Sequence, residues 1–420
     1  MIEGGQGKPL MPIEDRLQAA YLVILLTKRG INMKSYIKKY AKYFDYPLLF
    51  TYLALTIFGL IMIYSSSMAW SVNYYRSEPD RFYIQQLINL AIAFPIFALA
   101  AVFPYKHFKK RWLMKVILFV IFAGLIAVHF VGFAAGGAQS WISLGFANIQ
   151  PSEVAKVGII LYLSGVFANK YQNGTINKLN ESIIPPVIIL TLVLFSVFLE
   201  PDLGSMLIIA AVGLAVMSAS GVRLKPFIRL ATVFIIAASV IIIPFMVFAG
   251  DSIFTEKRLG RLDAFFNPFS DELGFGFQIV NGYLAIGSGG LSGLGLGQSI
   301  QKLGYLPEPH TDFIMSVISE ELGVFGVVFV LGGLGFIVLR GLWIAMTTHD
   351  PLARMLAAGV ASMIGIQSFV NLGGLTGIIP LTGVTLPFIS YGGTSVILLS
   401  LAMGVLMNVS MFNKYEKTKK

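Results

Sequence analysis

The stretch QKLGYLPEPHTDFIMSVISEE (Gln301–Glu321) joins the longest polar interval of the sequence to an apolar run that is long enough to cross a membrane. Asp312 stands at this junction, where we expect water to meet lipid. A carboxylate placed there can still ionise, and it can reach a molecule whose head is polar and whose tail lies in a bilayer. The stretch therefore predicts a membrane protein with a polar site at one membrane face.

The composition supports a polytopic α-helical membrane protein. The 420 residues are 56% hydrophobic and only 12% charged, with a mean hydropathy of +0.77, whereas soluble domains carry about 25% charged residues. The absence of cysteine excludes disulfides and thiolate chemistry. The net charge of +10 arises from lysine and arginine in short loops, a pattern that orients membrane proteins and does not require nucleic acid as a partner.

Hydropathy predicts an all-α polytopic membrane protein with about ten transmembrane helices. The predicted spans are roughly 46–64, 82–103, 112–133, 154–168, 183–199, 206–219, 230–249, 312–339, 355–372 and 395–412. Basic residues concentrate in the loops 105–111, 221–229 and 340–354 and in both tails, so we expect both termini in the cytoplasm. The large loop 250–311, between helices seven and eight, is then extracellular.

The chain divides into three predicted parts: a cytoplasmic extension (1–45), the ten-span domain (46–412) and a basic cytoplasmic tail (413–420). Met33 is an alternative start, and whether 1–32 belong to the native protein is left open. We find no clear internal repeat, which argues against a transporter built from inverted halves.

Asp312 has two interpretations. It could cap the eighth helix, because aspartate is favoured at that position, or it could act on a substrate together with its neighbours Glu308 and His310. In a helix that begins at Asp312, Ser316 and Glu320 would lie on the same face. Ionisable groups within spans are costly and often functional, so this face predicts a polar groove between helices.

Glu153 and Lys156 are three residues apart at the start of the fourth span and can form an ion pair on one helical face. The pair could fix helix packing, or Lys156 could bind a phosphate group while Glu153 orients it. Arg258, Arg261 and Lys302 lie in the long outer loop, where cations could stabilise phosphate charge or could simply be solvated.

Glu200 and Asp202 flank a break between the fifth and sixth spans. They could bind a divalent cation such as Mg²⁺ or Mn²⁺, or Asp202 could cap the sixth helix; no other cofactor is predicted. The run GSGGLSGLGLG (Gly287–Gly297) follows no strand and is not a dinucleotide fingerprint. It predicts a loop that is either mobile or tightly packed.

The sequence closely resembles the SEDS family (shape, elongation, division and sporulation), which includes the FtsW, RodA and SpoVE types. The matching stretches are YSSS (Tyr64–Ser67), GAQSWISLG…IQPSEVAK (Gly137–Lys156), EPDLGS (Glu200–Ser205), GFQIVNGYLAIGSGGLSGLGLGQSIQKLGYLPEPHTDFI (Gly276–Ile314), EELG (Glu320–Gly323) and GIIPLTGVTLPFISYGGTS (Gly377–Ser395). The overall pattern is most similar to the division-type FtsW members of Gram-positive bacteria. At Glu200 the sequence departs from the family, in which glutamine is more common.

The resemblance implies a ten-span peptidoglycan glycosyltransferase that polymerises lipid II at the outer face of the bacterial cytoplasmic membrane, for septal cell-wall synthesis in cell division. It maps the family's essential aspartate onto Asp312, as general base, and the family's acid–lysine pair onto Glu153 and Lys156. It implies a class B penicillin-binding protein and other divisome membrane proteins as partners. A groove between helices would admit the undecaprenyl tails of lipid II from the bilayer. The alternatives are a lipid II flippase and a non-catalytic scaffold that activates a penicillin-binding protein.

Overall fold

A computed structural model describes residues 42–135, 138–143, 148–200, 202–223, 263–269 and 276–419, together with Thr232, Gly260 and Gly274. The helices are α3 (Tyr46–Tyr75), α4 (Arg81–Val102), α5 (Arg111–Val131), α6 (Pro151–Gln172), α7 (Ile184–Leu199), α8 (Leu203–Ala219), α12 (Phe277–Gly289), α13 (Ile314–Thr347), α14 (Pro351–Leu375) and α15 (Gly393–Lys419). Three short helical turns are η1 (Tyr105–Lys109), η2 (Leu179–Ile183) and η3 (Gln301–Leu303).

The membrane-spanning character predicted from hydropathy is confirmed. Eight helical segments of the described chain are long and apolar enough to cross a membrane, and α8 is a shorter apolar helix. These segments overlap the predicted spans one to six and eight to ten. The seventh predicted span, 230–249, falls outside the described residues except for Thr232.

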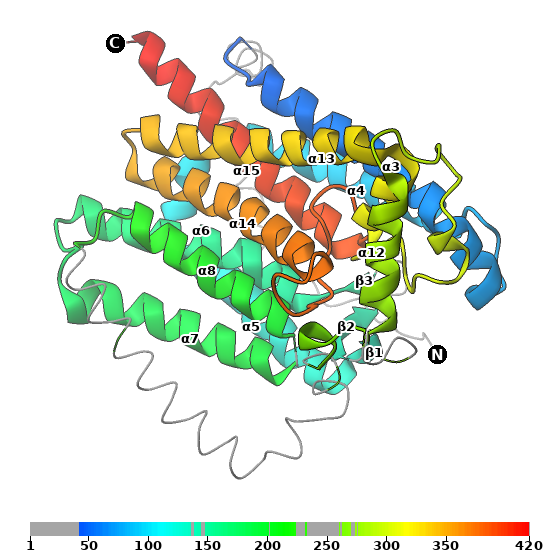
Figure 1. Cartoon of the computed structure of the whole chain (residues 1–420). Coiled ribbons are helices and arrows are strands. Elements are labelled where there is room, and N and C mark those ends of the chain that lie inside the picture. Colours follow the sequence, from blue (N-terminus) through cyan, green and yellow to red (C-terminus); the bar gives the residue numbers. More distant parts are fainter. Residues whose placement is uncertain are drawn as a thin grey trace, which may run out of the picture.

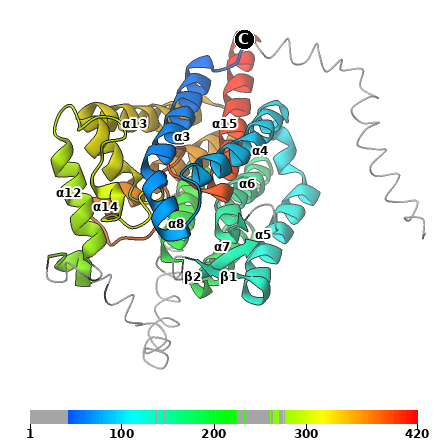
Figure 2. The ribbon, with the colours of Figure 1, turned by 90° about the vertical axis from the view of Figure 1, so that its right-hand side faces the viewer.

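The long helices pack as a bundle in which α14 and α15 are central (Figure 1). α14 packs against α13, α8 and α6, and α15 packs along α4. The view in Figure 2 shows α15 standing beside α4, with α12 and α13 on the opposite side of the molecule. Most of α6, α14 and α15 is buried inside the protein, whereas α5 and α7 expose more of their apolar surface. Polar side chains on the central helices can therefore find partners within the protein, as buried polar groups must.

The predicted loop between the third and fourth spans contains a small antiparallel sheet in the order β1-β2-β3. Its strands are β1 (Phe133–Ala135), β2 (Ala138–Ser143) and β3 (Asn148–Ile149). Ile142 of β2 pairs with Ile149 of β3. β3 ends at Ile149 and α6 begins at Pro151, so the sheet leads almost directly into that helix. The sheet lies at the same end of the bundle as the lower part of α12 (Figure 1). The long loop predicted for 250–311 is likewise partly helical, because it contains α12 and η3.

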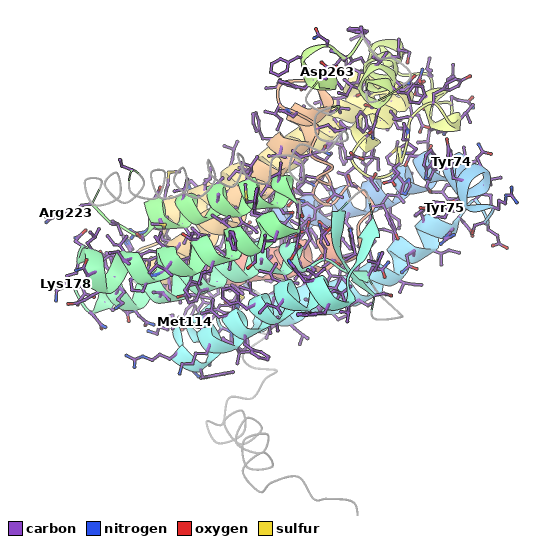
Figure 3. All side chains as sticks on the ribbon, turned by 90° about the horizontal axis from the view of Figure 1, so that it is seen from below. Tyr74, Tyr75, Met114, Lys178, Arg223 and Asp263 are labelled. Carbon is purple, nitrogen blue, oxygen red and sulfur yellow. The ribbon has the colours of Figure 1, made fainter. Side chains whose placement is uncertain are left out.

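Two groups of residues lie at opposite ends of the bundle. Figure 3 shows Met114, Lys178 and Arg223 at one end, and Tyr74, Tyr75 and Asp263 at the other. Lys178 and Arg223 are basic and follow α6 and α8, whereas Tyr74 and Tyr75 form the end of α3. The cytoplasmic position of the basic end stays a prediction.

The prediction that the eighth helix begins at Asp312 is wrong by two residues, because α13 begins at Ile314. Its backbone is non-helical at Gly323, where φ is 60° and ψ is −152°. This left-handed conformation is one that glycine adopts without steric cost. The break leaves helix carbonyls free, and the neighbouring loop uses them: Leu294 N–H donates to the Glu320 carbonyl at 2.9 Å.

Part of the glycine-rich run 287–297 packs tightly against α13, as one of the two predicted alternatives requires. Gly293 has a φ of 75°, and a Cβ atom at this position would lie only 2.2 Å from the Glu321 carbonyl oxygen. A Cβ atom on Gly289 would collide with the Ser319 carbonyl in the same way. Glycine is needed here because the loop backbone lies directly against the break in α13.

Candidate functional site

The predicted ion pair between Glu153 and Lys156 is present in the first turns of α6. Pro151 occupies the first turn, where its missing N–H costs nothing, and this sets the start of the helix. The Lys156 Nζ atom lies 2.7 Å from Glu153 Oε1. The lysine side chain is only 1% exposed and that of Glu153 is 10% exposed. A charged pair this deeply buried needs further hydrogen bonds, and α14 supplies one.

Two amide side chains on α14 connect this ion pair to the Asp312 segment. Gln367 Oε1 accepts a hydrogen bond from Lys156 Nζ at 3.2 Å, and Gln367 Nε2 donates to the Thr385 carbonyl at 3.0 Å. One helical turn later, Asn371 Nδ2 donates to the Val384 carbonyl at 2.7 Å and to the Asp312 carbonyl at 2.9 Å. The site therefore combines α6, α14, the loop between α14 and α15, and the residues before α13.

Asp312 is half-buried and lies just before α13. The position that precedes the helix is Phe313, which makes no side-chain cap, so Asp312 is not the cap of this helix. The Thr311 hydroxyl donates to Asp312 Oδ1 at 3.0 Å. With its backbone fixed by Asn371 and its carboxylate partly accessible, Asp312 retains the features expected of a group that contacts substrate.

Glu308 and His310 have different environments from each other. Glu308 is exposed and has a left-handed backbone with a φ of 43°, and its carbonyl accepts from the Thr311 hydroxyl at 2.8 Å. His310 is buried, with its ring centroid 4.0 Å from that of Phe82. This burial lowers the pKa of the His310 imidazole to about 3. The ring is therefore neutral near pH 7, so it offers no positive charge to a pyrophosphate. The His310 carbonyl accepts from Tyr391 N–H.

Lys302 is also placed differently from the prediction. Its ammonium donates to Glu321 Oε1 at 2.6 Å and to Ser65 Oγ at 3.0 Å. Side-chain exposure is 2% for the lysine and 0% for the glutamate. Lys302 is thus one half of a buried ion pair that joins η3, α13 and α3, and the structure does not present it to a phosphate group.

The predicted polar stripe from Asp312 to Ser316 and Glu320 does not form one groove. Asp312 precedes the helix, and the Glu320 carboxylate accepts hydrogen bonds from Ser299 Oγ at 2.5 Å and from Ile300 N–H at 2.9 Å. Glu320 therefore holds the loop before η3. Ser316 is buried, and its Oγ lies against α12 near Gly282.

Asp202 is the helix cap that the sequence offered as one alternative. Its Oδ1 accepts from Ser205 N–H at 2.9 Å, and its Oδ2 accepts from Gln150 Nε2 at 3.0 Å and from Ser152 Oγ at 2.9 Å. Glu200 is 1% exposed, and neither of its side-chain oxygens has a hydrogen-bond partner among the described residues. Nowhere in that part of the chain do three or more His, Asp or Glu side chains gather as a metal group would require. Asp202 is already used as a helix cap, but one or two carboxylates with waters can hold Mg²⁺, so a divalent cation at Glu200 and Asp202 stays a prediction.

Burial and the nearby Asp202 charge raise the pKa of the Glu200 carboxyl from 4.5 to about 8. Between these two values the unfolded chain loses this proton and the folded chain keeps it, so stability falls as pH rises through that window. We expect Glu200→Gln to remove this loss, so that its melting temperature exceeds that of wild type at pH 9 by more than at pH 5. Thermal unfolding in detergent from pH 4 to 9 measures this difference in melting temperature, and Glu181→Gln, at an exposed carboxylate, is the matched control. Parallel melting-temperature profiles for wild type and Glu200→Gln would show that folding does not raise the pKa of Glu200.

Arg258 and Arg261 lie outside the described residues. Three residues that the sequence reasoning missed are central to the observed contacts: Gln367, Asn371 and Glu321. The signal for the first two was available, since they are polar residues four apart within an apolar span. Glu321 adjoins Glu320 in the sequence, but only the fold shows which of the two pairs with Lys302.

Comparison with known proteins identifies the family. The family model for FtsW, RodA and SpoVE, described as "Cell cycle protein", matches residues 46–415. The chain is 45% identical over 387 residues to "Probable peptidoglycan glycosyltransferase FtsW" of Bacillus subtilis, covering 91% of this chain and 94% of the relative. It is 36% identical over 367 residues to "Stage V sporulation protein E" of the same organism, covering 87% and 96%.

Solved structures share the fold. A chain from a study of "Structural coordination of polymerization and crosslinking by a peptidoglycan synthase complex" aligns with a TM-score of 0.65 and 24% identity, covering 88% of this chain and 98% of that one. The rod shape determining protein RodA of Thermus thermophilus aligns with a TM-score of 0.59 and 25% identity, covering 87% and 96%. The resemblance inferred from the sequence motifs is confirmed, and the chain belongs to the FtsW, RodA and SpoVE family of multi-pass membrane proteins.

Proposed function

We propose that this chain is a peptidoglycan glycosyltransferase that polymerises lipid II into glycan strands, with Asp312 as the general base. The FtsW relatives that match over nine-tenths of the chain support the activity. The observation that carries the role of Asp312 is its position: a half-buried carboxylate just before α13, with its backbone anchored by Asn371. A carboxylate so placed is fixed in space and still open to a substrate.

The reaction needs one proton acceptor. The 4-hydroxyl oxygen of the acceptor sugar forms a bond to C1 of the donor, and the bond between C1 and the undecaprenyl pyrophosphate oxygen breaks. The electron pair leaves with the pyrophosphate, and the hydroxyl proton passes to the Asp312 carboxylate. Attack on the face opposite the leaving group converts an α-linked donor into a β-1,4 product. Pyrophosphate leaves readily, so no separate acid is needed.

Lys156 is the proposed cation for the leaving pyrophosphate. An ammonium group has three N–H donors, and the contacts to Glu153 and Gln367 use two of them. The Lys156 side chain is only 1% exposed, so this role requires the bound donor to open the site around it. The third N–H then donates to a phosphate oxygen, and a cation in a site that excludes water stabilises developing negative charge strongly. Glu153 then orients the ammonium and does not itself bind the substrate.

The proposed site faces outward and works with a partner. The basic Lys178 and Arg223 lie at the end of the bundle opposite Tyr74, Tyr75 and Asp263 (Figure 3), which supports a cytoplasmic position for the basic end. The shared fold with a chain of a peptidoglycan synthase complex supports a class B penicillin-binding protein as the partner. The FtsW relatives support a location at the division septum with other divisome proteins.

Wild-type protein in detergent micelles tests the proposed activity against both alternatives. The chain is purified with its penicillin-binding partner, the transpeptidase is acylated with penicillin, and lipid II is added. We expect glycan strands to form on a gel of labelled product. A micelle has no second leaflet, so a flippase would leave lipid II unchanged. A non-catalytic scaffold would also leave lipid II unchanged. A soluble glycosyltransferase is the positive control: if it consumes lipid II under the same conditions and the complex does not, the proposed activity is refuted.

A further inference from the structure

Gln367 and Asn371 hold the two ends of the candidate site from a single helix. They are four residues apart on α14, so their side chains lie on the same helical face. Both are buried, with exposures of 0% and 4%. Gln367 contacts Lys156 of α6, and Asn371 contacts the backbone of Asp312.

The same two amides also hold one short segment of the loop between α14 and α15. Gln367 donates to the Thr385 carbonyl and Asn371 donates to the carbonyl of the preceding residue, Val384. Each amide thus uses one contact for this loop and another for a candidate site residue. The loop segment, α6 and the Asp312 segment are thereby fixed at set positions along α14.

The partners determine how each amide is oriented. Asn371 faces two carbonyl acceptors, so the atom between them must be the NH₂ donor. Gln367 faces an ammonium donor on one side and a carbonyl acceptor on the other, which places its oxygen toward Lys156. An ionised aspartate or glutamate at these positions has no N–H or O–H to donate to these carbonyls.

We propose that Gln367 and Asn371 are positioning residues that set the location of Lys156 relative to Asp312. The inference rests on the proposed glycosyltransferase function. Asn371 fixes the backbone that carries the general base, so its loss moves the carboxylate away from the acceptor hydroxyl. Gln367 fixes the ammonium that meets the leaving pyrophosphate, so its loss weakens the hold on the donor.

The kinetic test compares Asn371→Ala and Gln367→Ala with wild type, each purified with the penicillin-binding partner. Misplacing a catalytic group by about 1 Å can cost about 10²-fold in rate, so we expect Asn371→Ala to lower kcat by about that factor with little change in KM. We expect Gln367→Ala to raise the KM for lipid II by about 10-fold, the effect of one weakened charge contact. Asn371→Leu, which has nearly the same shape and no donor, replaces the alanine variant if that fails to fold.

The matched control is Ser368→Ala, which lies between the two positions on α14. The Ser368 hydroxyl bonds only the Ile364 carbonyl of its own helix, so its removal should leave kcat and KM within about twofold of wild type, as expected for a helix hydroxyl with no other role. Equal losses in kcat for Ser368→Ala and Asn371→Ala would show that α14 is merely sensitive to substitution, and would overturn the proposal.

A second readout measures position without requiring activity. The chain contains no cysteine, so Thr311→Cys introduces a single thiol next to Asp312. We expect a thiol reagent to modify this cysteine at least about 10-fold faster when Asn371 is alanine, because the segment is released, and at an unchanged rate when Ser368 is alanine. Unchanged reactivity in both would overturn the positioning role. A wild-type complex that forms no glycan strands would refute the proposed function, while the cysteine measurement would still decide whether Asn371 positions the segment.

Discussion

Asp312→Asn is expected to lower the rate of glycan strand formation by about 10²–10⁴-fold, the range that a single general base contributes. Asparagine keeps the size of the side chain and can still accept a hydrogen bond from the Thr311 hydroxyl. It cannot accept the proton of the acceptor hydroxyl. The hydrogen bond from the Asn371 side chain reaches the backbone carbonyl of residue 312, so it should survive the substitution.

The substitution should leave the fold intact, because Asp312 is not the cap of α13. The measurement is the initial rate of lipid II consumption by the complex, together with its melting temperature. Glu78→Gln is the control: it neutralises an exposed carboxylate in the loop after α3, at the same end of the bundle as Tyr74 and Tyr75. If the Asp312→Asn and Glu78→Gln variants polymerised at the same rate, Asp312 would not be the base.

Lys302→Met is expected to give the largest loss of stability. It removes the ammonium from Glu321, a carboxylate that is 0% exposed, and leaves only Ser65 to solvate the charge. Breaking a buried ion pair by removing one partner costs about 3–5 kcal/mol of folding free energy. The melting temperature in detergent, or the yield of monodisperse protein when folding fails, measures the loss.

Two controls separate the buried charge from a general effect of removing lysine. Lys178→Met breaks an exposed pair with Glu181 and should cost less than about 1 kcal/mol. The double variant Lys302→Met/Glu321→Leu removes both charges and should recover much of the lost stability, because no uncompensated charge remains. A Lys302→Met protein as stable as wild type would show that Glu321 is not charged in the folded state.

Most of the fold could be predicted from the sequence, because a span is specified by the length of its apolar run. The prediction failed where three-dimensional partners decide the outcome. The sequence predicts Lys302 as a loop cation for phosphate and Glu320 as a groove residue. In the structure the break at Gly323 lies against the 291–303 loop, and both side chains hold that loop in place. A sequence pattern does not reveal which loop will fill a break in a distant helix.

The candidate site could be predicted only where its residues are close together in the sequence. The pairing of Glu153 with Lys156 follows from their spacing on one helix, and the structure contains it. The connection from that pair to Asp312 runs through Gln367 and Asn371, which lie some two hundred residues further along the chain than Lys156. Their polarity within an apolar span marked them as candidates, but only the packing of α14 between α6 and α13 gives them their partners.

Chemical rescue of Asp312→Ala tests most directly whether this carboxylate takes the proton. The alanine variant leaves room beside the acceptor hydroxyl, and a small carboxylate such as formate can act as a base there. The account predicts that strand formation by Asp312→Ala is barely detectable in sodium chloride and rises with sodium formate at the same ionic strength. Strand formation by Asp312→Ala at the wild-type rate, with no formate present, would contradict it.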